Sequence, residues 1–367
     1  MSDKLKQFDS WLGDDGPAAL VIREHLMPVE GPDGVLFPST FAASEDKTFK
    51  GGYNVDPFGD PASGKNVCLV DSVGSQANRI ETLFAREKYI GLVPQVTVKA
   101  GDKVVNLLEA GHRAGDAIVR CTALQKALQD AFKAAVQGNT EPLAKIAPTS
   151  LVFGVWDSRD TQAKLPRLIA STIRAFNVQP LKRSAQYNPP LNYAELEVFS
   201  EEDKAKAEGD AKSPLAKRGF VHHPASGSHG GVIATGGIRR DATLSLAALR
   251  FLNAGTDKTK TEALRRYILG LALVAFTYRP TSYLRQGCNL VLDPDKAAEF
   301  MEVQNDGHRK PARITHDDAV AYALAAAKAF GIGKDQQVEF DKELAKKDVQ
   351  GDAAEGDKAA KPKKAKA

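Results

Sequence analysis

The sequence predicts an α+β protein in which strands and helices are interleaved along the chain. An apolar run at 67–73 leads into a polar, helix-like segment at 71–87. Residues 219–240 have the pattern of a strand, a Gly-rich turn and a strand, and two long helical patterns follow at 259–278 and 316–330. The chain has 367 residues, of which 43% are hydrophobic, so its composition is globular and its length suits one large domain or two smaller ones.

Basic residues are concentrated in one segment, which runs from Ser150 to Pro189. The segment holds six Lys or Arg residues against two Asp residues, and this difference of +4 equals the formal net charge of the whole chain. The cations are Arg159, Lys164, Arg167, Arg174, Lys182 and Arg183. Trp156, Phe176 and Tyr187 lie among them. Such a mixture is typical of a nucleic-acid surface, because cations meet phosphates and flat side chains meet bases. A solvated amphipathic helix with an ordinary charged face is the alternative.

Within this segment the pattern predicts a strand followed by a helix. Residues 150–156 are apolar, β-branched and aromatic, which favours a strand. Apolar residues then recur at helical spacing from 165 to 176. On that helix Arg167, Ser171 and Arg174 would share the face opposite the apolar stripe.

Weaker signals place the remaining elements. We expect one short helix within 2–30, and an edge-like strand at 93–99, where apolar and polar residues alternate. Residues 116–136 have the composition of an Ala-rich amphipathic helix, and 191–199 alternates as a strand. Residues 200–218 are charged and of low complexity, which predicts a mobile loop.

The ends of the chain and its apolar runs set the expected organisation and location. We expect a single domain over 1–350 and a disordered basic tail over 351–367. The N-terminus lacks the apolar core of a signal peptide, and the most apolar run, 267–276, is about half a membrane span. The three cysteines are far apart and outside any CxxC pair, as in a reduced compartment. The sequence therefore predicts a cytoplasmic protein with no membrane partner.

Two short patterns imitate ligand sites without meeting their chemical requirements. Residues 59–66 resemble a P-loop but lack the final Ser or Thr that would bind magnesium. His222 and His223 are adjacent and would point to opposite faces of a strand, so they do not form a shared metal site with His229. The sequence thus predicts no cofactor and no metal.

Three polar residues, Gln76, Asn78 and Arg79, stand where the strand at 67–73 passes into a helix. Polar groups at such a junction can cap the helix. These three exceed what a cap requires, so we expect a binding role for them.

Four blocks of sequence resemble one known family, both in their residues and in their order along the chain. They are LVDSVGSQANRIE (69–81), FGVWDSRDTQAKLPRLIASTIRAF (153–176), SAQYNP (184–189) and GGVIATGGIRRDATLSLAALR (230–250). Together they resemble the backbone subunit of type I-G (formerly I-U) CRISPR Cascade complexes, in the RAMP superfamily. The resemblance covers roughly residues 30–330, and the stretch at 200–218 and the tail lie outside it.

The resemblance implies a hand-like RAMP fold, with a modified RRM-like (ferredoxin-like) palm carrying inserted helical and β-hairpin elements. One hairpin, the thumb, would kink a guide RNA. It also implies a non-catalytic subunit of antiviral defence that polymerises head to tail along guide RNA (crRNA) and presents it to complementary target DNA. Other Cascade subunits and a separate helicase-nuclease would be its partners. The predicted RNA-binding residues are Gln76, Asn78, Arg79, Arg113, Arg159, Lys164, Arg167, Arg174, Lys182, Arg183, Tyr187, Arg239 and Arg240.

Three alternatives stay open at the level of sequence. The chain could be an RNA endonuclease that processes the guide precursor, with His112, His222 or His229 as general acid or base. It could cut target RNA with a metal held by Asp71 or Asp157. It could also be an unrelated metabolic enzyme, although the basic segment lacks convergent carboxylates or histidines.

Overall fold

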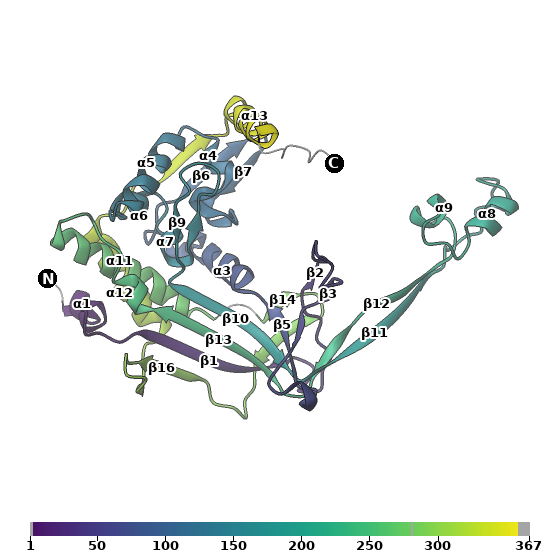
Figure 1. The fold of residues 1–367 in the computed structure, drawn as a ribbon, viewed down its shortest axis with the longest axis horizontal. Coiled ribbons are helices and arrows are strands. Elements are labelled where there is room, and N and C mark those ends of the chain that lie inside the picture. The colour runs from purple at the N-terminus through teal and green to yellow at the C-terminus, as the bar shows by residue number, and fades with distance from the viewer. Residues whose placement is uncertain (1–2, 280–281, 359–367) are drawn as a thin grey trace, which may run out of the picture.

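The computed structural model describes residues 3–279 and 282–358, and its centre is a curled antiparallel sheet (Figure 1). The sheet has nine strands in the order β14-β15-β1-β13-β10-β5-β4, with β16 added beside β1 and β17 beside β16. The strands are β1 Ala19–Pro28, β4 Val55–Pro57, β5 Asn66–Asp71, β10 Ile169–Phe176, β13 Ile238–Ser245, β14 Tyr283–Arg285, β15 Cys288–Leu292, β16 Glu299–Val303 and β17 Arg309–Pro311. Helices pack against this sheet, so the predicted α+β class is confirmed.

The two faces of the sheet differ because side chains alternate along each strand. In β1 and β13, Ile22 lies opposite Ala242, and both are buried in the main hydrophobic core. The next pair in the register, Arg23 and Asp241, points to the other side and is partly exposed. We call these the packed face and the open face of the sheet.

Helices cover the packed face. They are α3 Val73–Glu81, α7 Thr149–Phe153, α11 Lys258–Thr277 and α12 His316–Phe330. Helix α11 is buried along most of its length and lies against α12, where a Cβ on Gly270 would come within 2.8 Å of the Ala323 Cα. The glycine therefore permits the close approach of the two helices that seals the core.

Six of the elements occur along the chain in the order β1, α3, β10, β13, α11 and β15, with other elements inserted between them. The four strands of this set lie in the spatial order β15-β1-β13-β10, and every neighbouring pair is antiparallel. Helices α3 and α11 both contribute to the core on the packed face. The remaining sheet strands extend this unit on either side.

A long two-stranded arm, residues 178–234, projects from the body (Figure 1). It consists of β11 Val178–Tyr187 and β12 His223–Ala234, with α8 Glu201–Ala207 and α9 Pro214–Lys217 at its tip. The strand predicted at 191–199 is wrong, since turns occupy that stretch. Residues 200–218 hold two short helices with a small core of Ala207, Ala216 and Val221 where a loop was expected.

Two predictions in the basic segment are wrong. Helix α7 and the two-residue strand β8, Val155–Trp156, replace the strand expected at 150–156, and β10 replaces most of the helix expected at 165–176. Ile169, Ser171, Ile173 and Ala175 are buried at every second position, which fits a strand. Pairing of β10 with both β13 and β5 overrides the helical spacing of the other apolar residues.

Outside that segment some predicted elements are confirmed and others are wrong. Strands β5, β12 and β13 and helices α3, α11 and α12 confirm the elements expected there. The helix expected within 2–30 is wrong for its second half, which is β1, although α1 Asp3–Lys6 and α2 Asp9–Leu12 precede it. The helix expected at 116–136 is divided into α4 Ala117–Arg120 and α5 Gln125–Val136, and α6 Glu141–Ile146 follows.

Three small sheets and the C-terminal helix complete the described residues. Strand β6, Val96–Ala100, lies between β7 Lys103–Asn106 and β18 Gln336–Glu339, so it is central and not an edge strand. The other two are β2 Thr40–Phe41 with β3 Gly52–Tyr53, and β8 with β9 Lys164–Leu165.

Helix α13, Lys342–Lys358, crosses the boundary placed at residue 350, and residues 359–367 lie outside the described part. The division into one domain and a disordered tail stays a prediction. Within the described residues, every helix falls short of the length and apolar character needed to span a bilayer.

Candidate nucleic-acid interface

An open groove of about 570 Å³ lies on the body beside α3 and α7. Its lining comes from residues 111–113 and from residues between 154 and 167. These two segments are over 40 residues apart in the chain, and the second belongs to the basic segment. We call this feature the groove.

The wall of the groove is the short β8–β9 hairpin, in which Trp156 pairs with Lys164. Asp157 stabilises the connecting loop, because its Oδ2 accepts hydrogen bonds from the Thr161 amide at 2.9 Å and hydroxyl at 2.7 Å. Gly154 has φ +79°, and a Cβ there would lie 2.6 Å from the Arg167 Cγ. A glycine at this position therefore lets the Arg167 side chain pass over the turn.

Arg113 forms the floor of the groove and is only 4% exposed. Its Nε lies 2.6 Å from the Glu81 Oε2, Nη1 donates to the Gly154 carbonyl at 3.2 Å, and Nη2 donates to the Asn78 Oδ1 at 3.1 Å. The guanidinium also lies 5.4 Å from the centroid of the Phe153 ring. One buried side chain thus connects α3, α7 and the turn at Gly154.

Burial dominates the titration of this buried ion pair. It raises the pKa of Glu81 to about 7, although the Arg113 cation and a Thr149 hydrogen bond act in the opposite direction. Burial lowers the pKa of Arg113, Glu81 opposes this change, and the nearby Arg167 cation adds to it. At neutral pH, Glu81 therefore offsets part of the Arg113 charge, and the free charge of the groove comes chiefly from its rim.

The rim carries cations and one exposed aromatic side chain. Lys164 and Arg167 are exposed, and neither forms an ion pair with a carboxylate among residues 3–279 and 282–358. The Lys164 Nζ lies 5.5 Å from the centroid of the Trp156 ring. His112 stands at the edge, with its Nδ1 3.6 Å from the Asp116 Oδ2. The groove therefore offers unpaired positive charge next to a flat ring.

Gln76 and Arg79 lie around a buried carboxylate instead of lining the groove. Asp71 is fully buried, and its Oδ2 accepts a hydrogen bond from the Gln76 Nε2 at 2.5 Å. The Arg79 Nε lies 3.5 Å from the same oxygen, and the Arg285 Nη2 lies 2.6 Å from the Asp71 Oδ1. Gln76 also accepts a hydrogen bond from Ser171 at 3.2 Å. In this arrangement Gln76 supports the sheet beside the groove.

Arg174 and Arg239 lie side by side on the open face of the sheet, where β10 pairs with β13. The Arg239 Nε is 2.8 Å from the Asp241 Oδ2, and the Arg23 Nε is 3.3 Å from the Asp241 Oδ1. The Arg239 guanidinium also lies 4.8 Å from the Phe176 ring centroid. A carboxylate therefore compensates part of the positive charge on the open face.

Three other predicted residues lie on the arm. Lys182 and Arg183 are exposed on β11, and Tyr187 stands at its end. The Tyr187 hydroxyl donates a hydrogen bond to the Gly219 carbonyl at 3.1 Å.

Two predicted residues remain. Arg159 is exposed in the β8–β9 loop, next to the groove-lining Ser158, whereas Arg240 is buried on the packed face with its Nε 2.6 Å from the Glu24 Oε2. The structure thus brings Asn78, Arg113, Lys164 and Arg167 together, with Arg159 in the adjacent β8–β9 loop, and distributes the others over α3, the sheet and the arm. RNA binding by all thirteen stays a prediction.

The residues named for the enzymatic alternatives are also dispersed. His112 is at the groove, while His222 and His229 belong to the arm. Asp71 is enclosed by Gln76 and two arginines, and Asp157 holds the β8–β9 loop. Among the described residues there is no group of three or more His, Cys, Asp or Glu side chains that could hold a metal ion.

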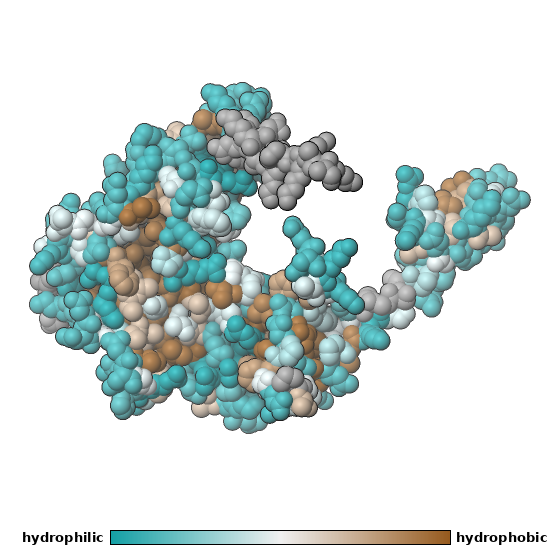
Figure 2. Space-filling view, in the orientation of Figure 1, coloured by the Kyte–Doolittle hydropathy of each residue, from teal (hydrophilic) through white to brown (hydrophobic). Residues whose placement is uncertain are grey.

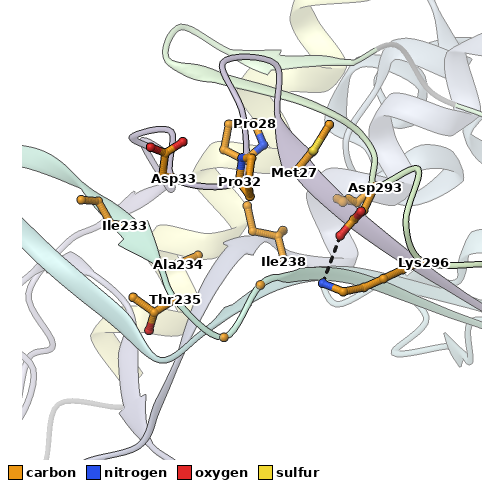
Figure 3. A pocket seen from close by; sticks show the side chains of 13 residues that line it. Met27, Pro28, Pro32, Asp33, Ile233, Ala234, Thr235, Ile238, Asp293 and Lys296 are labelled. Carbon is orange, nitrogen blue, oxygen red and sulfur yellow. Dashed lines mark ion pairs between the residues drawn. The ribbon is translucent and has the colours of Figure 1, made fainter.

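A second hollow, of about 400 Å³, lies at the root of the arm (Figure 3). The end of β1 and the turn between β12 and β13 line it, and Figure 3 shows Ile233, Ala234 and Ile238 around it. Its lysine, Lys296, is paired with Asp293 at 3.0 Å. This hollow therefore offers little free positive charge to a polyanion.

Sequence reasoning missed one feature of the groove and left another incomplete. It counted Trp156 among the flat side chains that meet bases, but it did not show which of these rings is exposed, and the exposed fraction of Trp156 is 56%. Glu81 closes the quoted block 69–81, yet nothing in the sequence linked it to Arg113. Three apolar residues at 151–153 followed by a glycine were the available signal that a turn, and so an exposed Trp156, comes next.

One comparison with known proteins gave a match. Residues 20–180, somewhat under half of the chain, match the family model described as CRISPR-associated protein GSU0053. The matched range contains α3, the groove and β10 but ends near the start of the arm. No curated protein matches the chain. The family match indicates a CRISPR-associated protein.

Proposed function

We propose that the chain is a guide-RNA-binding backbone subunit of a type I-G CRISPR interference complex. The observation that carries the proposal is the groove, where exposed Lys164 and Arg167 meet without a carboxylate partner in the described residues. Asn78 and Arg113 bring the 69–81 block to the same place. The match over residues 20–180 supports a role in a CRISPR system.

The residue types at the groove suit RNA of any sequence. Arg, Lys and Asn side chains contact phosphates and 2′-hydroxyls, which leaves the base edges free to pair with target DNA. One copy that touches about five phosphates should lose on the order of 100-fold in affinity between about 50 and 200 mM salt. Tight binding then requires many copies linked along one strand. Head-to-tail contacts between copies are heterologous and lead to an open filament.

The order of elements supports an RRM-like palm. The succession β1, α3, β10, β13, α11 and β15, with spatial order β15-β1-β13-β10, is that of a ferredoxin-like βαββαβ unit. We infer that the arm is the thumb of this hand-like protein. Figure 2 supports this assignment, because a deep bay with a mostly hydrophilic rim separates the body from the tip of the arm.

In this proposal the chain has no catalytic role of its own. Asp71 and Asp157 serve structural contacts, which supports that part of the proposal. Target cutting belongs to a separate helicase-nuclease, and other Cascade subunits complete the particle.

Assembly on RNA tests the proposal. Particle mass should be measured for the purified protein with and without single-stranded RNA of several lengths. We expect RNA-length-dependent particles for the wild type and none for the triple variant Arg159→Ala, Lys164→Ala, Arg167→Ala. A matched control, Lys103→Ala, Arg309→Ala, Lys328→Ala, removes three exposed cations elsewhere and should assemble normally. Normal particles from the groove variant would contradict the proposal.

The same samples separate a binding subunit from an enzyme. The RNA should stay intact during incubation with the wild-type protein. Discrete cuts in a guide precursor that disappear with His112→Ala would favour the endonuclease.

A further inference from the structure

We propose that Trp156 is a base-stacking platform, so that the groove binds one nucleotide of a single-stranded RNA. The base lies on the indole ring, and the flanking phosphates lie at Lys164 and Arg167. This inference rests on the proposed function and adds a second recognised group, the face of a base, to the phosphates.

The two tryptophans of the chain are in opposite environments. Trp11 is 7% exposed, stacks on Phe8 with 4.7 Å between ring centroids, and donates its Nε1 hydrogen to Glu302 at 3.0 Å. Trp156 is 56% exposed and has neither an aromatic neighbour nor an indole hydrogen bond within the described residues. Single exposed apolar residues are common, so exposure alone assigns no role. The role of Trp156 is inferred from its surroundings.

The main chain holds Trp156 in place while more than half of the side chain stays exposed. Val155 before it is buried in the core, and Asp157 after it anchors the loop. The Trp156 carbonyl is so close to Gly115 that a Cβ there would lie 3.1 Å from it. A ring presented from a fixed backbone loses little entropy when a ligand stacks on it, which favours binding.

The neighbouring charges complete a nucleotide site. Lys164 lies 5.5 Å from the Trp156 ring centroid, and Arg167 lines the same groove. The groove volume of about 570 Å³ is within the usual size of small-ligand sites, about 300–1,000 Å³. Because every base has an aromatic face, stacking tolerates any sequence, as a guide-binding subunit requires.

The other three aromatic residues of the basic segment are less available, and one of them, Phe153, is fully buried. Phe176 packs edge-on against Phe58 at 6.1 Å and lies under Arg239. Tyr187 is hydrogen bonded through its hydroxyl and lies beside His223. Trp156 is therefore the aromatic side chain of this segment best placed to meet a base.

Intrinsic fluorescence tests the inference, because only two tryptophans report. Short single-stranded RNA should quench the emission of the wild type on saturation. The variant Trp156→Phe, which keeps buried Trp11 as its reporter, should bind RNA with unchanged emission. An abasic strand with the same phosphates should bind more weakly and leave Trp156 unquenched.

Affinity measurements give an independent readout. Trp156→Ala should weaken binding of ordinary RNA by about 5- to 100-fold and should leave binding of the abasic strand unchanged. Phe251→Ala, which removes an aromatic ring that is 81% exposed outside the groove, is the matched control and should bind as the wild type. RNA binding with unchanged Trp156 emission would overturn this inference alone. No RNA binding by the wild type would overturn the proposed function and this inference with it.

Discussion

The groove and the open face of the sheet both carry exposed or partly exposed cations, yet they differ in the carboxylates that lie beside those cations. At the groove, Lys164 and Arg167 lack a carboxylate partner among the described residues, and beneath them Glu81 offsets part of the charge of buried Arg113. On the open face, Asp241 lies between Arg23 and Arg239 and neutralises part of their charge. The number of cations on a surface therefore does not reveal how many of them are free to bind a polyanion.

This difference has an energetic meaning. A phosphate that approaches Arg23 or Arg239 on the open face must compete with a carboxylate already paired with them, whereas a phosphate at the groove displaces only water and counterions. The groove should therefore contribute more to RNA affinity for the same number of charges. The floor of the groove should contribute more to the stability of the fold than the rim does, because Arg113 and Glu81 are both buried.

The largest expected effect separates the floor of the groove from its rim. Arg113→Ala leaves Glu81 buried without its partner and should lower the free energy of unfolding by about 3–5 kcal/mol. The double variant Lys164→Ala, Arg167→Ala should change it by no more than about 0.5 kcal/mol, since both side chains are exposed. Urea denaturation of the three proteins makes the measurement. Equal losses in the free energy of unfolding of the two variants would show that floor and rim do not differ in their contribution to stability.

The pH dependence of stability tests the ionisation of Glu81 in the floor of the groove. Burial raises the pKa of Glu81 from 4.5 to about 7, so between these values the folded protein binds more protons than the unfolded chain. Stability should consequently fall as pH rises through this window, with a slope of at most about 1.4 kcal/mol per pH unit from this group. Glu81→Gln should remove that component. If the variant keeps the slope of the wild type in urea titrations from pH 5 to 8, another group is responsible.

A smaller effect should appear when the open face is made to resemble the groove. Asp241→Asn releases Arg23 and Arg239 from their shared carboxylate and should strengthen RNA binding by about two- to fivefold at low salt. Asp317→Asn, which releases exposed Lys88 on another part of the body, is the control for the change in net charge. Fluorescence anisotropy with labelled RNA would detect the difference. A weaker complex for Asp241→Asn would mean that the carboxylate orders the arginines for binding.

Sequence patterns predicted the elements whose local and tertiary preferences agree. The apolar run of β5, the polar start of α3 and the long apolar helix α11 carry their own signals. Strand β10 does not, because its apolar residues fit helical and strand spacing alike and only its pairing partners decide. The arm was missed for a related reason, since the polar sequence of β11 becomes a strand only beside β12.

The predicted site residues show the same limit, because their positions also depend on tertiary packing that a single sequence does not contain. Gln76 and Asn78 are two positions apart on α3 and so point in different directions, one to buried Asp71 and the other to Arg113. Which of them faces the groove depends on how α3 packs against β10, and a single sequence does not contain that information. The four residues that meet at the groove come from α3, the 111–113 turn and the β8–β9 region, whose proximity is set by the fold.

The salt dependence of RNA binding tests the central claim most directly. Dissociation constants should be measured over a range of salt concentrations for the wild type, for Lys164→Ala, Arg167→Ala and for Arg174→Ala, Arg239→Ala. Because each phosphate contact on a single strand contributes about 0.7 to the slope of log affinity against log salt, the groove variant should lower the slope by about 1.4. The open-face variant should lower it by about 0.7, half as much, since Asp241 already pairs with Arg239 whereas Arg174 has no carboxylate partner among the described residues. An unchanged slope for the groove variant, with a clear loss for the open-face variant, would contradict the account.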